Sequence, residues 1–124
     1  MSLDVDLRRT AQVSRICSEC ENEHTCTEVT WFYTANITHN LAKMAREAGI
    51  YDVVWEPEKN GITTASELIK PLEVGIALMK SNPQRFKEFD SPNGWGLYEN
   101  FVPWLEGYLE ACREYPDAEV VASR

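Results

Sequence analysis

Hydrophobic and polar residues alternate along the first third of the chain, which is typical of strands that bury one face. The first alternating stretch has its apolar residues at Leu3, Val5, Leu7, Ala11 and Val13. The second has them at Val29, Trp31, Tyr33, Ala35 and Ile37. Arg9 interrupts the first stretch and Phe32 the second. Because β-branched and aromatic residues also favour strands, the pattern predicts a hairpin with the cysteine-containing segment 17–26 at its tip.

From Ile37 onward the apolar residues recur at the three- and four-residue spacing of an amphipathic helix. The positions on this face are Ile37, Leu41, Met44, Ala45 and Ala48. Gly49 follows them and is a natural helix end, because glycine adopts the left-handed backbone of a C-terminal cap. The segment 50–62, with turn residues near its end, is predicted to be a connector.

Two further helices follow from the same spacing. One begins at the capping-box sequence Thr64–Glu67 and ends before residues 81–83, and Pro71 inside it predicts a kink or a displaced start. The other covers residues 97–112, after a predicted loop at 86–96, and residues 119–122 are expected to form a short last strand. Residues 1–124 are therefore expected to form one α+β domain, in which about three helices cover a small antiparallel sheet.

A polar cluster marks the predicted junction between the second strand and the first helix. It consists of Asn36, Thr38, His39 and Asn40. Asn36 is the expected N-cap of a helix that starts near Ile37, because its side-chain oxygen can accept a backbone N–H from the first turn. On that helix His39 lies opposite the apolar face, so it is expected to be exposed unless another segment covers it. A neutral imidazole at a helix start can also act as an acid or base.

A second polar cluster is the sequence SPNGWGLY at residues 91–98. Ser91–Gly94 suits a β-turn with proline at its second position, and Gly96 permits a close backbone approach beside Trp95. Asn93, Trp95 and Tyr98 are candidate ligand-binding residues of this loop. The alternative for its aromatic residues is a place at the edge of the core.

The cysteine-containing segment supplies candidate metal ligands. Cys17 and Cys20 form a C-x-x-C pair, and His24 and Cys26 follow shortly after. Such a pair is half of a typical zinc site, but a second C-x-x-C is absent and the remaining spacings are tight. The chain therefore carries either a structural zinc ion on these four residues or a set of free thiols.

Composition narrows the partners of the protein. The 124 residues carry a formal net charge of −8, and the Lys and Arg residues form no stripe, which disfavours binding to nucleic acid. No apolar run reaches the roughly 20 residues that span a bilayer, and the N-terminus has no signal-peptide core. These features predict an acidic, soluble, cytoplasmic protein.

Residues 29–124 resemble a family of small uncharacterised bacterial and phage proteins, through the blocks NITHNL at 36–41 and NGWGLY at 93–98. The resemblance implies no activity. The blocks shared with the family correspond here to Asn36, Thr38, His39, Asn40, Asn93, Gly94, Trp95, Gly96 and Tyr98.

Three functions remain open at this stage. The favoured one is a binding domain with a cleft for a small ligand or a partner protein between the T-H-N turn and the N-G-W-G loop. Its candidate residues are Asn36, Thr38, His39, Asn40, Asn93, Trp95 and Tyr98. The alternatives are an enzyme that uses His39 as acid or base, and a zinc-bearing interaction domain.

Overall fold

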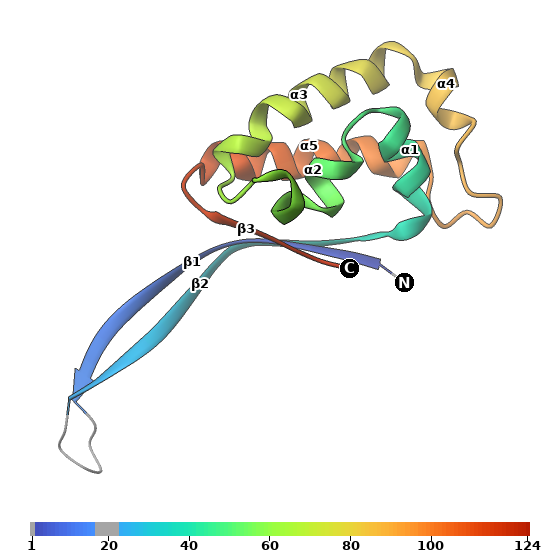
Figure 1. The fold of residues 1–124 in the computed structure, drawn as a ribbon. Coiled ribbons are helices and arrows are strands. Elements are labelled where there is room, and N and C mark those ends of the chain that lie inside the picture. The colour runs from blue at the N-terminus through green and yellow to red at the C-terminus, as the bar shows by residue number, and fades with distance from the viewer. Residues whose placement is uncertain (1, 17–22) are drawn as a thin grey trace.

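The computed structural model describes the backbone of residues 2–16 and 23–124, and the side chains of residues 2–11 and 28–124. In these ranges two long strands come first, helices follow, and a short strand ends the chain (Figure 1). The elements are β1 (Ser2–Ile16), β2 (Glu23–Thr38), the 3-10 helix η1 (His39–Leu41), α1 (Ala42–Glu47), α2 (Tyr51–Trp55), the 3-10 helix η2 (Pro57–Asn60), α3 (Ser66–Ser81), α4 (Pro83–Lys87), α5 (Tyr98–Glu114) and β3 (Glu119–Ser123). This confirms the predicted α+β class.

The sheet is antiparallel throughout, with the strand order β2-β1-β3. β1 therefore lies in the middle, and β3 pairs only with its segment Asp4–Arg8. The paired residues Leu3 and Ile37 both face the helices and are buried. The N-terminal hairpin and the short C-terminal strand expected from the sequence are both present.

A register shift between Leu7 and Arg8 explains why Phe32 interrupts the alternation. Leu7 pairs with Tyr33 and Arg8 pairs with Trp31, so Phe32 is the extra residue of a β-bulge. Beyond this point the hairpin leaves the helical layer and projects away from it (Figure 1). The expectation that Val29, Trp31 and Ala11 lie on a buried face is wrong, because all three are exposed. The bulge turns Trp31 and Val29 onto the face that they share with their partners Arg8 and Thr10, opposite to Leu7 and the helices. Ala11 follows the bulge, on the part of the hairpin that projects beyond the helices.

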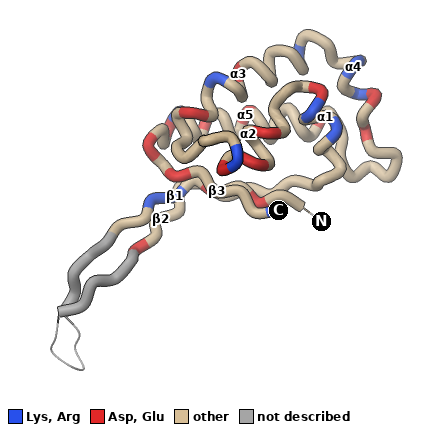
Figure 2. The backbone as a smooth tube through the Cα atoms, viewed as in Figure 1, with Lys and Arg blue, Asp and Glu red and all other residues tan. Residues whose placement is uncertain are grey.

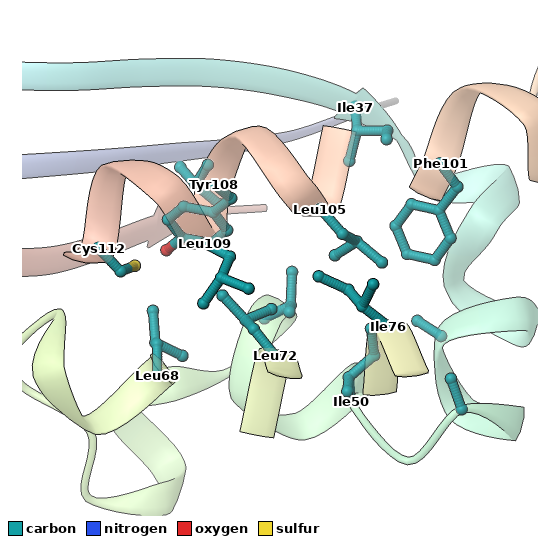
Figure 3. Close-up of a cluster of buried hydrophobic side chains, with 14 of the residues drawn as sticks. Ile37, Ile50, Leu68, Leu72, Ile76, Phe101, Leu105, Tyr108, Leu109 and Cys112 are labelled. Carbon is teal, nitrogen blue, oxygen red and sulfur yellow. The ribbon is translucent and has the colours of Figure 1, made fainter. Parts of the chain in front are cut away.

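The helices form two layers on one face of the sheet. α5 lies between the sheet and α3 (Figures 1 and 3). Tyr108 of α5 stacks on Tyr33 of β2 with ring centroids 5.9 Å apart, and Leu105 and Leu109 point towards α3 (Figure 3). α3 contributes its buried side chains Leu68, Leu72, Ile76 and Met79 to the same core. α5 can occupy the middle layer because its apolar face is wide enough to contact the sheet on one side and α3 on the other.

Two short helices were not expected from the sequence. α2 lies in the predicted connector and buries Trp55, and α4 begins at Pro83 and buries Phe86, at the start of the predicted loop. Each has five residues, fewer than two turns, so the helical period cannot show in the sequence. Among the described residues, no helix has both the length and the apolar character needed to cross a membrane.

The start of α3 confirms half of the predicted capping box. The Glu67 carboxylate accepts the backbone N–H groups of Thr63 and Thr64, each at 3.2 Å. These bonds lower the pKa of Glu67. The Thr64 hydroxyl donates to the same carboxylate and makes no capping bond to the helix. The helix then runs unbroken through Pro71, so the proline does not displace its start.

Candidate functional site

The two polar clusters, far apart in the sequence, lie side by side in the structure. The end of β2 and η1 form one wall of a groove of about 850 Å³, and the loop before α5 forms another. The groove is lined by Ser2, Asn36, Ile37, Thr38, Asn40, Leu41, Asn93, Gly94, Trp95, Gly96, Leu97, Asn100 and Trp104. This volume lies within the range of small-molecule sites.

A hydrogen bond joins the two walls of the groove. The side-chain amide of Asn40 donates to the carbonyl oxygen of Trp95 at 2.7 Å. Gly96 is buried beside this bond with φ at 123°, a backbone conformation that side chains with a Cβ rarely adopt. A Cβ on Gly96 would lie 2.9 Å from the Cβ of Asn40. Glycine is therefore required for the close approach of the loop to η1.

The loop keeps its shape through its own hydrogen bonds. Gly94 N–H donates to the Ser91 carbonyl at 3.1 Å, which closes the predicted β-turn. The Asn93 side-chain oxygen accepts the Trp95 N–H at 2.9 Å and the Ser91 hydroxyl at 2.6 Å. The turn places the Trp95 side chain at the rim of the groove, where 71 % of its surface is exposed.

α5 supplies the remaining wall through Asn100 and Trp104, which the sequence patterns did not single out. The Trp104 indole N–H donates to the carbonyl oxygen of Asn36 at 3.1 Å, which ties α5 to the end of β2. The Trp104 ring also stacks on Phe101, with centroids 6.3 Å apart. Asn100 and Trp104 are one helical turn apart and share a face, a spacing that the sequence contains. That face becomes part of a candidate binding site only because the loop before α5 lies against it.

The lining of the groove carries no charge. None of its described residues is Asp, Glu, Lys, Arg or His, although 26 % of the chain is charged. The sequence shows why: residues 29–42 and 91–98 contain no Asp, Glu, Lys or Arg. Figure 2 shows charged residues on the helices and on the strands, while the loop between α4 and α5 is uncharged after its start. The groove therefore suits an uncharged ligand.

The role expected for Asn36 as a helix N-cap is wrong. β2 continues to Thr38, and the N-cap of η1 is Thr38, whose hydroxyl accepts the Asn40 N–H at 3.3 Å. Asn36 instead pairs with Asp4 in the sheet, and its side-chain amide donates to that carboxylate at 2.7 Å. Pairing with β1 holds the chain extended for two residues longer than the apolar spacing indicates.

The N-cap hydroxyl of Thr38 is expected to stabilise the fold. Thr38→Ala should lower the free energy of unfolding by about 1 kcal/mol, because it removes the side-chain cap. Thr38→Ser keeps the hydroxyl and should remain close to the wild type. Asn36→Ala should cost about half as much as Thr38→Ala, because, among the described residues, the side chain of Asn36 bonds only to other side chains at the surface and caps no helix. Urea denaturation of the three variants measures these differences, and a larger loss in Asn36→Ala than in Thr38→Ala would contradict this prediction.

His39 is half-buried, so the expectation of an exposed side chain is also wrong. Its Nδ1 accepts the indole N–H of the buried Trp55 at 3.0 Å. The orientation predicted for His39 from the α-helical period is wrong because residues 39–41 form a 3-10 turn and not the first turn of an α-helix. With Nδ1 occupied as an acceptor, the neutral ring carries its proton on Nε2.

Two candidate residues do not line the groove. His39 borders a neighbouring hollow that also contains Lys43, Arg46 and Asp90. Tyr98 points to the end of α3, where its hydroxyl donates to the Met79 carbonyl at 2.8 Å. The structure thus brings together Asn36, Thr38, Asn40, Asn93 and Trp95 and leaves these two outside.

The candidate zinc ligands fall outside the residues whose side chains are described. Cys17 and Cys20 lie in the undescribed segment 17–22, and the backbone of His24 and Cys26 belongs to β2 and not to a loop. Among the described residues, no group of three or more His, Cys, Asp or Glu side chains is placed to hold a metal ion. The zinc site stays a prediction that elemental analysis of the purified protein can test.

The fourth cysteine, Cys112, lies far from this segment in the sequence and is buried in the core. Burial raises the pKa of its thiol to about 12, so it is an inert packing residue at neutral pH.

Comparisons with protein-family models, with curated proteins and with solved structures found no match to the chain. The resemblance to proteins with the NITHNL and NGWGLY blocks accordingly stays a prediction.

Proposed function

We propose that the chain is a binding domain that holds a small uncharged ligand in the groove between the end of β2, the loop 91–97 and α5. The observation that carries the proposal is the lining itself. Four asparagines and two tryptophans from three separate segments meet around one opening, and among the described residues no charged side chain lines it. Binding sites combine apolar surface with a few polar groups that fix the orientation of the ligand, and this groove has both.

The chemistry of the groove favours binding over catalysis. Its described lining contains no side chain that exchanges a proton near neutral pH, so general acid–base catalysis has no agent there. His39 lies outside the groove, and Trp55 occupies its Nδ1 lone pair. In this tautomer the neutral ring offers no free lone pair to act as a base. The geometry therefore supports a structural role for His39 as a link between η1 and α2.

A screen of uncharged fragments by NMR on ¹⁵N-labelled protein tests the proposal. Ligands should shift the indole N–H signals of Trp95 and Trp104 and the side-chain amide signals of Asn40 and Asn100. The Trp31 indole, on the uncovered part of β2, should not move. Binding should be insensitive to salt between about 0.05 and about 0.5 M, because no charged side chain of the described residues lines the groove.

Two matched variants test whether the fragments bind in the groove or elsewhere on the surface of α5. Asn100→Trp places a bulky side chain in the groove and should abolish the fragment shifts. Glu99→Trp adds the same side chain at the neighbouring exposed position of α5, which does not line the groove, and should leave binding unchanged. Fragment binding that survives Asn100→Trp, or a screen without any hit at the groove, would refute the proposal.

A further inference from the structure

We infer that the ligand of this groove is a neutral saccharide, held by amide hydrogen bonds and by stacking on tryptophan. This inference rests on the proposed function and names its ligand class. It follows from three properties of the groove: the mixed donors and acceptors left unused by its asparagines, the two indole rings, and the absence of charge in its described lining.

The free hydrogen-bonding atoms of the groove are of both kinds. Asn36 uses its amide nitrogen for two hydrogen bonds to the protein, which leaves its side-chain oxygen as an acceptor. Asn40 uses its nitrogen for one, which leaves its oxygen as an acceptor and one N–H as a donor. Asn93 uses its oxygen twice, which leaves its nitrogen as a donor. Asn100 has no side-chain hydrogen bond to any described residue and offers both.

Hydroxyl groups match this set better than charged ligand groups do. A hydroxyl donates and accepts, so neighbouring hydroxyls of a sugar can satisfy an amide oxygen and an amide nitrogen together. A phosphate or carboxylate only accepts and would leave the Asn36 and Asn40 oxygens without a partner. An ammonium group only donates and would leave the Asn93 nitrogen without one. Unpaired polar groups in a filled site reduce affinity, so the amide pattern selects against both kinds of ion.

The tryptophans supply the apolar half of such a site. Trp95 stands at the rim with 71 % of its surface exposed, although a large exposed indole is costly in water. The ring face of an indole is electron-rich and attracts the weakly positive C–H groups of a sugar ring. Trp104 is held in place by its hydrogen bond to the Asn36 carbonyl and by its contact with Phe101. Such a fixed ring loses little conformational freedom when a ligand binds.

The uncharged lining of the groove favours a saccharide over a nucleotide. Aromatic side chains also stack on bases, but sites for nucleic acids add Lys or Arg side chains for the phosphates. The described lining of this groove has none, and the protein as a whole carries a charge of −8. The volume of about 850 Å³ suits a short oligosaccharide better than a single sugar ring.

A titration of ¹⁵N-labelled protein followed by NMR tests the inference. The probes are maltose, cellobiose and N,N′-diacetylchitobiose, compared with adenosine, uridine and a blocked dipeptide as uncharged ligands of other classes. At least one disaccharide should shift the indole signals of Trp95 and Trp104 in a saturable manner. Trp95→Ala should weaken that binding at least about tenfold, the cost of one lost stacking contact. Trp95→Phe, with a smaller aromatic face, should be intermediate.

Trp31→Ala is the matched control, because it removes the other strongly exposed indole of the described residues at a place remote from the groove. It should leave disaccharide binding unchanged. Trp95 is exposed, so its variants should keep the wild-type circular dichroism spectrum, and a variant that unfolds is replaced by Asn100→Ala in the same titration.

The outcomes distinguish this inference from the proposed function. If a nucleoside or the blocked dipeptide shifts the groove signals and no disaccharide does, the binding domain stands and the saccharide is wrong. If no probe and no uncharged fragment shifts them, both are wrong. A disaccharide that binds equally well to Trp95→Ala also overturns the inference.

Discussion

Trp55→Ala should lower the free energy of unfolding by about 4 kcal/mol, the usual cost of removing a buried large aromatic side chain. Trp55 is 1 % exposed and lies where α2 meets α5 and η1. Its ring stacks on Tyr51 at 5.4 Å and meets Phe101 edge-on at 6.2 Å between centroids. The cavity left by alanine cannot be filled without moving α2. Urea denaturation monitored by circular dichroism measures the loss.

Trp55→Phe separates packing from hydrogen bonding at the same position. Phenylalanine retains an aromatic ring but leaves His39 Nδ1 without its donor, so a loss of about 2 kcal/mol is expected. His39→Ala leaves the indole N–H without its acceptor and should cost a similar amount. Because both changes break one bond, their combined effect should be clearly smaller than their sum. If the losses of Trp55→Phe and His39→Ala simply add in the double variant, the hydrogen bond between the two side chains contributes little. A loss below about 1 kcal/mol in Trp55→Ala would show that α2 is not part of the core.

Gly96→Ala should cost about 3 kcal/mol and should also weaken any ligand binding in the groove. The added Cβ meets the Asn40 Cβ at 2.9 Å, and φ at 123° is strained for any residue with a side chain. Relief of the clash moves the loop away from η1 and lengthens the hydrogen bond between Asn40 and the Trp95 carbonyl. Thermal melting gives the stability, and the Trp95 indole signal in NMR reports the displacement.

Gly94→Ala is the control for the effect of backbone strain alone. Gly94 also has a positive φ, at 78°, but a Cβ added there would meet nothing within 4 Å. It should therefore lose only about 1 kcal/mol, the cost of the left-handed backbone. If Gly94→Ala and Gly96→Ala destabilise the protein equally, the close approach between the loop and η1 is not what requires glycine at position 96.

The boundaries that the sequence missed have a common cause. The apolar spacing places a helix start at Ile37, yet Ile37 pairs with Leu3 in the sheet and the chain stays extended to Thr38. Residue 37 satisfies both patterns, since it is apolar at a position that suits a buried strand and a helix face. Strand pairing, an interaction with a distant segment, decided between them. The same competition displaced the N-cap from Asn36 to Thr38 and turned His39 towards Trp55.

The sequence by itself determined the class of the fold and the identity of the two polar segments. Alternation predicted the hairpin, three- and four-residue spacing predicted the positions of α3 and α5, and the turn Ser91–Gly94 followed from its residue types. These features depend on neighbours in the chain, so local patterns are sufficient to reveal them. The charge-free stretches 29–42 and 91–98 are equally visible in the sequence, although the groove that residues of both stretches line is not.

Only the tertiary structure decided how these segments combine into a groove. Its walls are joined by Asn40 and Trp95, 55 residues apart, and by Trp104 and Asn36, 68 residues apart. Contacts of this kind depend on the layering of α5 between the sheet and α3, which is set by the packing of whole elements and leaves no periodic trace in the chain. The packing placed Asn100 and Trp104 in the groove, and for the same reason it placed His39 and Tyr98 outside it.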